Sequence, residues 1–198
     1  MISGMIAVML LSSLPVTASG QHYSSGNPAG PSDSYWKRFV IGAGVSLLAH
    51  ESAHILTSLA LGFHPYIAFD KGRPTVYSGI DTNKEPHKQF LFSAAGLTTQ
   101  ALIDEAILDI PHSRGGAIER GILAGGIGTT LFYITIGRNG SVSDISFMAR
   151  TSSLSKTQLS LIFGGFSAIQ ALRISRDSSY VHFFVRPTQN GAALGFTF

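Results

Sequence analysis

The feature that most constrains this chain is the motif His-Glu-Ser-Ala-His at residues 50–54, which lies inside an apolar run covering residues 39–63. If this run is helical, residues four apart share one face, so the imidazoles of His50 and His54 converge on one point. Two such imidazoles and a third protein ligand bind Zn²⁺ and leave a fourth position open for water. Glu51 lies beside them and can take the proton of that water, so the motif predicts metal-dependent hydrolysis, most often of a peptide bond.

The composition favours a chain that is partly solvated by lipid. Of its 198 residues, 44% are hydrophobic and only 13% are charged, about half the usual charged share. The mean hydropathy is positive, at +0.25. A pI of 9.3 is compatible with nucleic acid, but the formal charge of +3 is spread along the chain without a basic patch, so we expect no nucleic-acid partner.

The N-terminus resembles an export signal followed by a linker. Residues 5–16 are apolar, and Val16-Thr17-Ala18 has small residues at the two positions that a signal peptidase reads, so we expect cleavage after Ala18 and a signal peptide over residues 1–18. The first residues carry no Lys or Arg, which keeps an uncleaved anchor as the alternative. Residues 19–34 are rich in Gly, Ser, Pro and Asn and predict a flexible linker. The chain has no Cys, which excludes disulfides and thiolate ligands.

Four apolar segments predict a mainly α fold, a helical membrane bundle with short β-hairpins. An aromatic and basic cluster at residues 35–38 precedes the first segment, as is typical where a helix meets lipid headgroups. The first segment is long enough to span a bilayer, and the third is rich in Gly and Thr, which suits close helix packing in lipid. The last is shorter, and either spans or packs as a partly buried helix. The segments cover residues 39–61, 89–110, 117–136 and 159–174.

Two hairpins are expected around turn-forming residues. Residues 66–69 and 75–77 are β-prone runs that flank a Gly and a Pro, directly after the first helix. Asn190-Gly191 separates two further β-prone runs near the C-terminus, a strong hairpin signal. We therefore expect a membrane-embedded domain over residues 35–176 and a C-terminal hairpin over residues 177–198.

Three polar residues outside the motif are candidates for the site. Gln100 and Asp104 are four apart in the second apolar segment, where they either line the same cavity and orient substrate or reach the aqueous end of the helix. Asp144 is the only acid between Glu119 and Asp177 and follows a Gly-rich turn. It either caps the helix that follows or supplies a carboxylate oxygen as the third metal ligand.

In combination, these elements resemble the site-2 protease family of intramembrane zinc metalloproteases. The resemblance covers residues 39–150 and consists of the motif at 50–54 in a hydrophobic helix, a β-rich loop after it, Ala95-Gly96 in the next helix, and residues 140–144 at the start of another. It implies an endopeptidase that cuts peptide bonds in or near membrane-spanning segments.

The resemblance also implies roles for individual residues. His50, His54 and Asp144 would be the zinc ligands, and Glu51 would be the catalytic base. The chain departs from the family at Leu97, where the family usually has Pro, and at Ile145, where it usually has Gly.

The resulting hypothesis is a zinc-dependent intramembrane endopeptidase. We expect its partners to be a membrane protein or peptide substrate and the lipid bilayer, and we expect it in the bacterial inner membrane after export. The basic residues divide evenly between the two sides of the bundle and assign no orientation, and the oligomeric state stays open. Two alternatives remain. One is an inactive membrane scaffold that keeps the fold, and the other is a secreted zincin-type metallopeptidase with Asp104, Glu105 or His112 as its third ligand.

Overall fold

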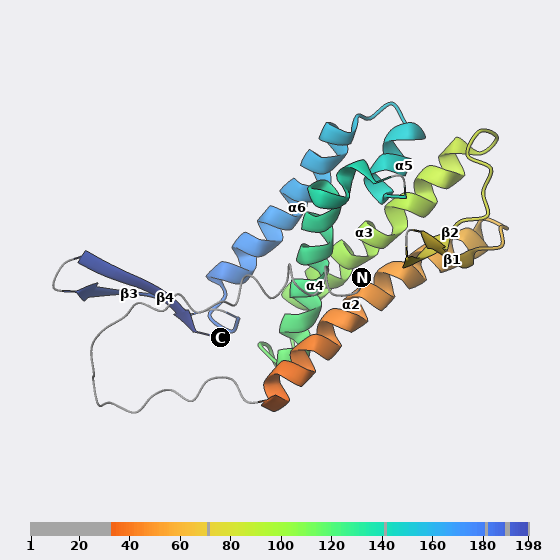
Figure 1. Cartoon of the computed structure of the whole chain (residues 1–198). Helices are drawn as coiled ribbons and strands as arrows, with labels where there is room; N and C mark the ends of the chain where they lie inside the picture. Colours follow the sequence, from red (N-terminus) through yellow and green to blue (C-terminus); the bar gives the residue numbers. More distant parts are fainter. Residues whose placement is uncertain (1–32, 71, 141, 181, 189–190, 198) are drawn as a thin grey trace.

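The computed structural model describes residues 33–70, 72–140, 142–180, 182–188 and 191–197. Within these ranges the chain is mainly α-helical, with two separate antiparallel hairpins (Figure 1). The expected mainly α class with two hairpins is therefore confirmed. The predicted signal peptide at 1–18 and all of the predicted linker except its last two residues lie outside the described residues.

Each predicted apolar segment forms one helix. α2 begins at Asp33 rather than at residue 39, so the aromatic and basic cluster belongs to the helix, and an acid in its first turn complements the helix dipole. α6 also extends beyond its predicted ends, because Ser155 and Gln158 form a capping box at its start. The helices are α2 (Asp33–Ala60), α3 (Pro86–Asp109), α4 (Ala117–Ile134), α5 (Asp144–Arg150) and α6 (Lys156–Arg176), with a 3-10 turn at Ile136–Asn139.

Both hairpins have the expected place in the chain. β1 (Tyr66–Asp70) pairs antiparallel with β2 (Arg73–Tyr77), and Gly72 in the turn takes a φ of 80°, which glycine adopts without strain. β3 (His182–Thr188) pairs antiparallel with β4 (Gly191–Thr197). Figure 1 shows β1 and β2 beside the C-terminal part of α2.

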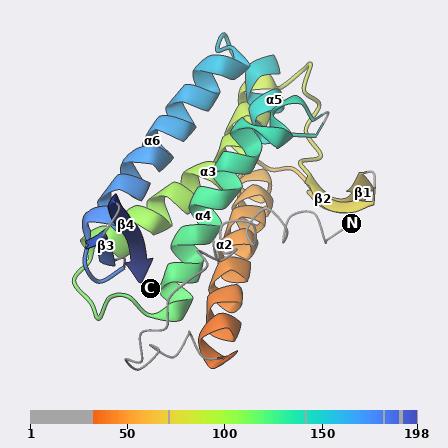
Figure 2. The same cartoon turned by 60° about the vertical axis from the view of Figure 1, so that its left-hand side comes forward.

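The helices pack through small residues and one small apolar core. α2 lies along both α3 and α4, and α6 covers the far side of α3 and α4 (Figure 2). A Cβ added to Gly42 would lie 2.0 Å from the carbonyl oxygen of Ile118, and one added to Gly121 would lie 2.0 Å from that of Phe39. The backbones of α2 and α4 thus touch at two glycines.

The core that holds α5 consists of Leu97, Ile145, Met148 and Leu159, which are fully buried together. Leu97 belongs to α3, Ile145 and Met148 to α5, and Leu159 to α6. This cluster fixes the start of α5 against the middle of α3, which is where the candidate site lies.

Many large apolar side chains face outward on α2 and α6. α2 is the one helix of the described ranges that is long and apolar enough to cross a membrane, and only 33% of its most apolar window is buried. A helix of this kind near the N-terminus is either a membrane span or a signal sequence, so the predicted bundle of about four spans stays a prediction. The outward residues are Val40, Ile41, Val45, Leu48, Leu56 and Leu59 on α2, and Leu161, Ile162, Phe166, Ile169 and Leu172 on α6.

Replacement of Gly42 by Ala should destabilise the fold by about 1–3 kcal/mol, because the new methyl group overlaps the α4 backbone. Equilibrium unfolding of the purified chain measures this. Gly44→Ala is the matched control, since it lies in the same helix with no atom within 4 Å of its added Cβ. It should be neutral or stabilising by up to about 1 kcal/mol. Equal effects of the two substitutions would contradict the close contact between α2 and α4.

Candidate metal centre

Two histidines of α2 turn their rings toward one point inside the protein. His50 and His54 are one helical turn apart and both are buried. Their Nε2 atoms lie 3.1 Å from each other. The spacing of the motif thus produces the convergence that a helix predicts.

Asp144 joins the two histidines from a different helix. Its Oδ2 atom lies 3.1 Å from His50 Nε2 and 3.4 Å from His54 Nε2. Asp144 is buried at the first position of α5, and Ser143 occupies the N-cap without a side-chain cap bond. The Asp144 carboxylate therefore faces the histidines, and it is not the helix cap that the sequence left as an alternative. Within the described residues, His50, His54 and Asp144 form a group that can hold a metal ion.

The Nδ1 atom of each imidazole lies against a hydrogen-bond acceptor, and this contact fixes the tautomer of each ring. His50 Nδ1 lies 2.9 Å from Gln100 Oε1, and Gln100 Nε2 donates to the carbonyl oxygen of Ser46 at 3.2 Å. A carbonyl only accepts, so the Gln100 amide orientation is set and His50 Nδ1 is the donor. His54 Nδ1 donates to the carbonyl oxygen of Phe92 at 2.6 Å. In the neutral rings, both Nε2 atoms consequently carry lone pairs.

Three lone-pair atoms therefore face one another in a buried space. Asp144 Oδ2 has no hydrogen-bond partner in the part of the chain that the structure describes. With neutral imidazoles and an ionised carboxylate such an arrangement is repulsive, and a metal ion between the three atoms, or a proton on one imidazole, relieves it. Zinc with bonds of about 2.0–2.1 Å in tetrahedral geometry separates its ligands by about 3.3 Å. The observed separations of 3.1, 3.1 and 3.4 Å fit this requirement.

Gly96 of α3 leaves the space that such an ion needs. A Cβ at this position would lie 2.5 Å from His50 Cε1 and 2.6 Å from His54 Nε2. The α3 backbone thus lies directly against the ligand atoms, and any side chain would fill their common space. The ring of Tyr133 stacks on His50 at a centroid distance of 5.5 Å and closes the other side of that imidazole.

Glu51 stands next to the ligand group without belonging to it. It follows His50 in α2, is partly exposed, and is close enough to His54 to act on it electrostatically. Partial exposure is compatible with a base that exchanges protons with water and substrate.

Gln100 and Asp104 are both buried, at 1% exposure each. The Gln100 amide is hydrogen-bonded to His50, Ser46 and Thr129, and the roles of Gln100 and Asp104 toward substrate stay predictions. Asp104 lies farther along α3, and its carboxylate packs against Gly126 of α4. A Cβ added to Gly126 would lie 2.3 Å from Asp104 Oδ2. It is not part of the ligand group.

The other residues considered as a third ligand are engaged elsewhere. Glu105 pairs with Arg173 of α6. His112 Nε2 lies 3.2 Å from a carboxylate oxygen of Glu119. Of the carboxylates weighed from the sequence, Asp144 is the one that the structure places beside both histidines.

Three residues that complete the site do not stand out in the sequence, whereas Gly96, which acts through its missing side chain, belongs to the elements that carry the resemblance. Phe92 acts through its backbone carbonyl, which no motif shows. Ser46 lies one turn before His50 on the same face of α2, and Thr129 is an ordinary residue of a Thr-rich helix. Among these three residues, only the periodicity around His50 offers a signal, and it points to Ser46 alone.

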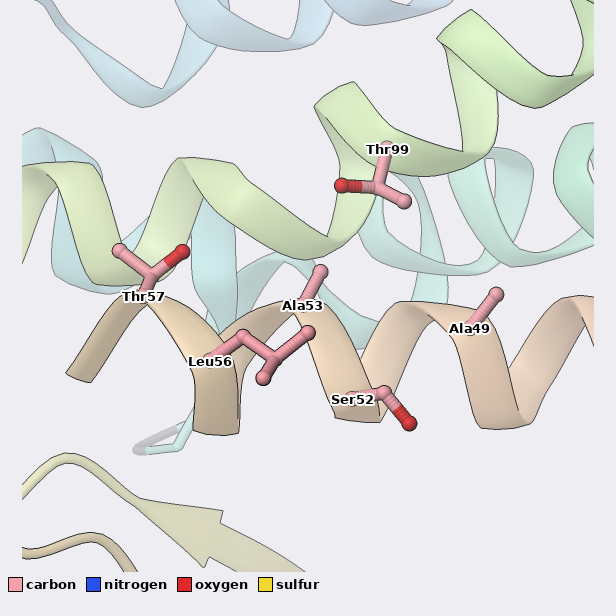
Figure 3. Close-up of a pocket in the computed structure, with 6 residues that line it drawn as sticks. All are labelled: Ala49, Ser52, Ala53, Leu56, Thr57 and Thr99. Atoms are coloured by element: carbon pink, nitrogen blue, oxygen red, sulfur yellow. The ribbon is translucent and has the colours of Figure 1, made fainter. Parts of the chain in front are cut away.

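A shallow groove runs over the outside of α2 at the level of the motif (Figure 3). Its volume is about 380 Å³; Leu56 and smaller side chains of α2 form one wall, and Thr99 of α3 lies on the other. Ser52 and Ala53, the two central residues of the motif, line it, but no metal-ligand candidate does.

Comparison of the chain with family models, with curated proteins and with solved structures gives no match. The resemblance to the site-2 protease family thus rests on the residues quoted from the sequence and stays a prediction.

Gly96→Ala should abolish metal binding, because the new methyl group would occupy the space between the ligand atoms. The measurement is the metal content of the purified protein after zinc loading and dialysis. Gly165→Ala, in α6 with open space around its added Cβ, is the control and should keep full stoichiometry. Retention of bound zinc by a folded Gly96→Ala variant would place the metal elsewhere.

Gln100→Leu should weaken zinc binding by about 10- to 100-fold, because His50 loses the acceptor that fixes its tautomer. Competition with a chelator of known affinity measures the change. Gln170→Leu is the matched control, since Gln170 is also a buried glutamine, and it joins α6 to the carbonyl oxygen of Ala101 in α3. It should lower stability and leave the zinc affinity unchanged. An equal loss of affinity in both variants would mean that Gln100 acts only through folding.

Proposed function

We propose that the chain is a zinc-dependent endopeptidase that hydrolyses peptide bonds in or near membrane-spanning segments. The observation that carries this proposal is the convergence of His50 Nε2, His54 Nε2 and Asp144 Oδ2, and Glu51 directly follows His50 in the chain. Two imidazoles and one carboxylate are the donor set of hydrolytic zinc sites.

The number of protein ligands supports a catalytic rather than a structural metal. Structural zinc sites are closed by four protein ligands, whereas hydrolytic sites have three and keep one position for water or substrate. The ligand group here has three members within the described residues. When bound, zinc supplies Lewis-acid polarisation of the scissile carbonyl and lowers the pKa of the attacking water.

The residues of the chain then have separate roles. Glu51 accepts the proton of the attacking water and returns it to the leaving amine. Gln100 and the Phe92 carbonyl hold the two imidazoles with their Nε2 lone pairs directed inward. Gly96 keeps the α3 side of the ligand group free of a side chain.

The membrane part of the proposal is supported by the outer surface. Leu48 and Leu56 flank the motif on α2 and are exposed by 68% and 64%. Such apolar rows on α2 and α6 are solvated favourably by lipid. At the depth of the motif, water would have to reach Glu51 through the protein rather than from the lipid face. We therefore propose a location in the bacterial inner membrane.

The two departures from the family pattern do not touch the ligand group. Leu97 and Ile145 are each fully buried and belong to the same core cluster. They fill one contact between α3 and α5, and this contact positions Asp144. This packing supports the proposal that the chain differs from the family pattern in its apolar core and matches it in the metal ligands.

Glu51→Gln should lower peptide cleavage by about 100-fold or more and leave zinc stoichiometry unchanged, because only the base is lost. The assay is cleavage of a fluorogenic membrane-spanning peptide by the zinc-loaded full chain in liposomes. Asp144→Ala should lose both zinc and activity. Glu85→Gln, which alters a surface pair with Lys88 at 3.0 Å, is the control and should change neither.

Undiminished cleavage by Glu51→Gln would refute the assigned mechanism. Zinc binding that depends on Asp144, without zinc-dependent cleavage by the wild-type chain, would instead favour the scaffold that keeps the fold.

A further inference from the structure

A second hollow, of about 510 Å³, lies between the β1–β2 hairpin and the helices that carry the metal centre. The hairpin side is formed by Val76 and Tyr77 of β2, and α3 contributes Phe92. Val142 and Phe147, from the start of α5 and the residues before it, form the opposite wall.

Two of these walls are also parts of the metal centre. The ring of Phe92 lies 4.8 Å from that of His54, and the Phe92 carbonyl accepts the His54 Nδ1 proton. Val142 lies two residues before Asp144 in the chain. The hollow therefore adjoins the ligand group. When the carbonyl of a substrate lies at the metal position, a side chain next to that carbonyl can reach the hollow.

The polar groups at the base of the hollow are already used within the protein. The Ser78 carbonyl accepts from Ser58 Oγ at 2.7 Å, and Ser78 Oγ donates to Gln89 Oε1 at 2.6 Å. Ser78 Oγ also accepts from the backbone N–H of Ile80 at 3.1 Å. With these groups paired, the wall offers a ligand mainly its aromatic and aliphatic side chains.

Aromatic rings dominate the remaining surface. Tyr66 and Tyr77 are opposite one another in the hairpin and stack at 5.2 Å, and both line the hollow together with Phe92 and Phe147. Rings arranged in this way bind apolar and aromatic groups through burial and edge contacts. Asp81 is the acidic residue of the lining and disfavours an anionic ligand group.

We infer that this hollow is the specificity pocket for the substrate side chain adjacent to the scissile bond, and that it selects a large apolar residue such as Phe, Leu or Met over a small or acidic one. This inference rests on the proposed peptidase function and names the substrate class of that site.

The test uses a series of hydroxamic acids on one scaffold, which differ only in the side chain next to the zinc-chelating group: benzyl, isobutyl, methyl or carboxymethyl. Their affinities for the zinc-loaded full chain in detergent are measured by calorimetry. The benzyl and isobutyl compounds should bind about tenfold or more tightly than the methyl compound, because more apolar surface is buried. The carboxymethyl compound should bind most weakly. Equal affinities across the series, or no binding by any member, would overturn the inference without the need for a variant.

Val76→Trp, which fills the hollow from β2, should reduce the ratio between benzyl and methyl affinities to about twofold or less. Ile67→Trp is the matched control, since Ile67 lies opposite Val76 in the hairpin, is 65% exposed and does not line the hollow. It should keep the wild-type ratio. An unchanged ratio of benzyl to methyl affinities in a folded Val76→Trp variant would mean that the side chain of the bound hydroxamate does not lie in this hollow.

Binding of hydroxamates does not require turnover, so the two proposals fail separately. If the hydroxamates bind in the expected order of affinity but the chain shows no zinc-dependent peptide cleavage, the pocket is supported and the peptidase function is refuted. If cleavage depends on Glu51 but the hydroxamates bind with equal affinities, the specificity pocket is refuted and the peptidase function is supported.

Discussion

Three lone-pair atoms that face one another in a buried space are the constraint on which the rest of the structure depends. When both imidazoles are neutral and no cation is bound, His50 Nε2, His54 Nε2 and Asp144 Oδ2 repel one another at separations of 3.1 to 3.4 Å. The atoms come from α2 and α5, and α3 closes the space with the bare backbone of Gly96. An ion bound at this point would join α2 to α5 with α3 packed against it, and its binding would contribute to folding.

Helix packing also controls the state of the imidazoles. Gly125 of α4 lies against Ser46 of α2, where a Cβ would be 2.7 Å from the Ser46 Cβ. This close approach lets Ser46 and Thr129 accept hydrogen bonds from the Gln100 amide nitrogen. The amide oxygen of Gln100 in turn accepts a hydrogen bond from His50 Nδ1. A small residue on one helix thus helps to determine, through two hydrogen bonds, which nitrogen of a histidine on another helix faces the candidate metal position.

The sequence predicted the parts of this site that depend on local geometry. The pairing of His50 and His54 follows from helical spacing, and both hairpins follow from their turn residues. The hydrogen bonds that complete the site join residues 29 to 54 positions apart. One of them uses the backbone carbonyl of Phe92, a group that every residue has, so no residue type marks it. Long-range packing of this kind is not readable from periodicity.

Leu97 and Ile145 show why the metal centre and the apolar core form one unit. Both are fully buried in the same cluster. Ile145 directly follows Asp144 in α5, and Leu97 directly follows Gly96 in α3. Each core residue is therefore coupled through one peptide bond to a residue at the metal centre. The Leu97–Ile145 packing fixes the distance between the bare backbone of α3 and the carboxylate of α5, and a change of either core residue has to preserve that distance for the ligand group to form.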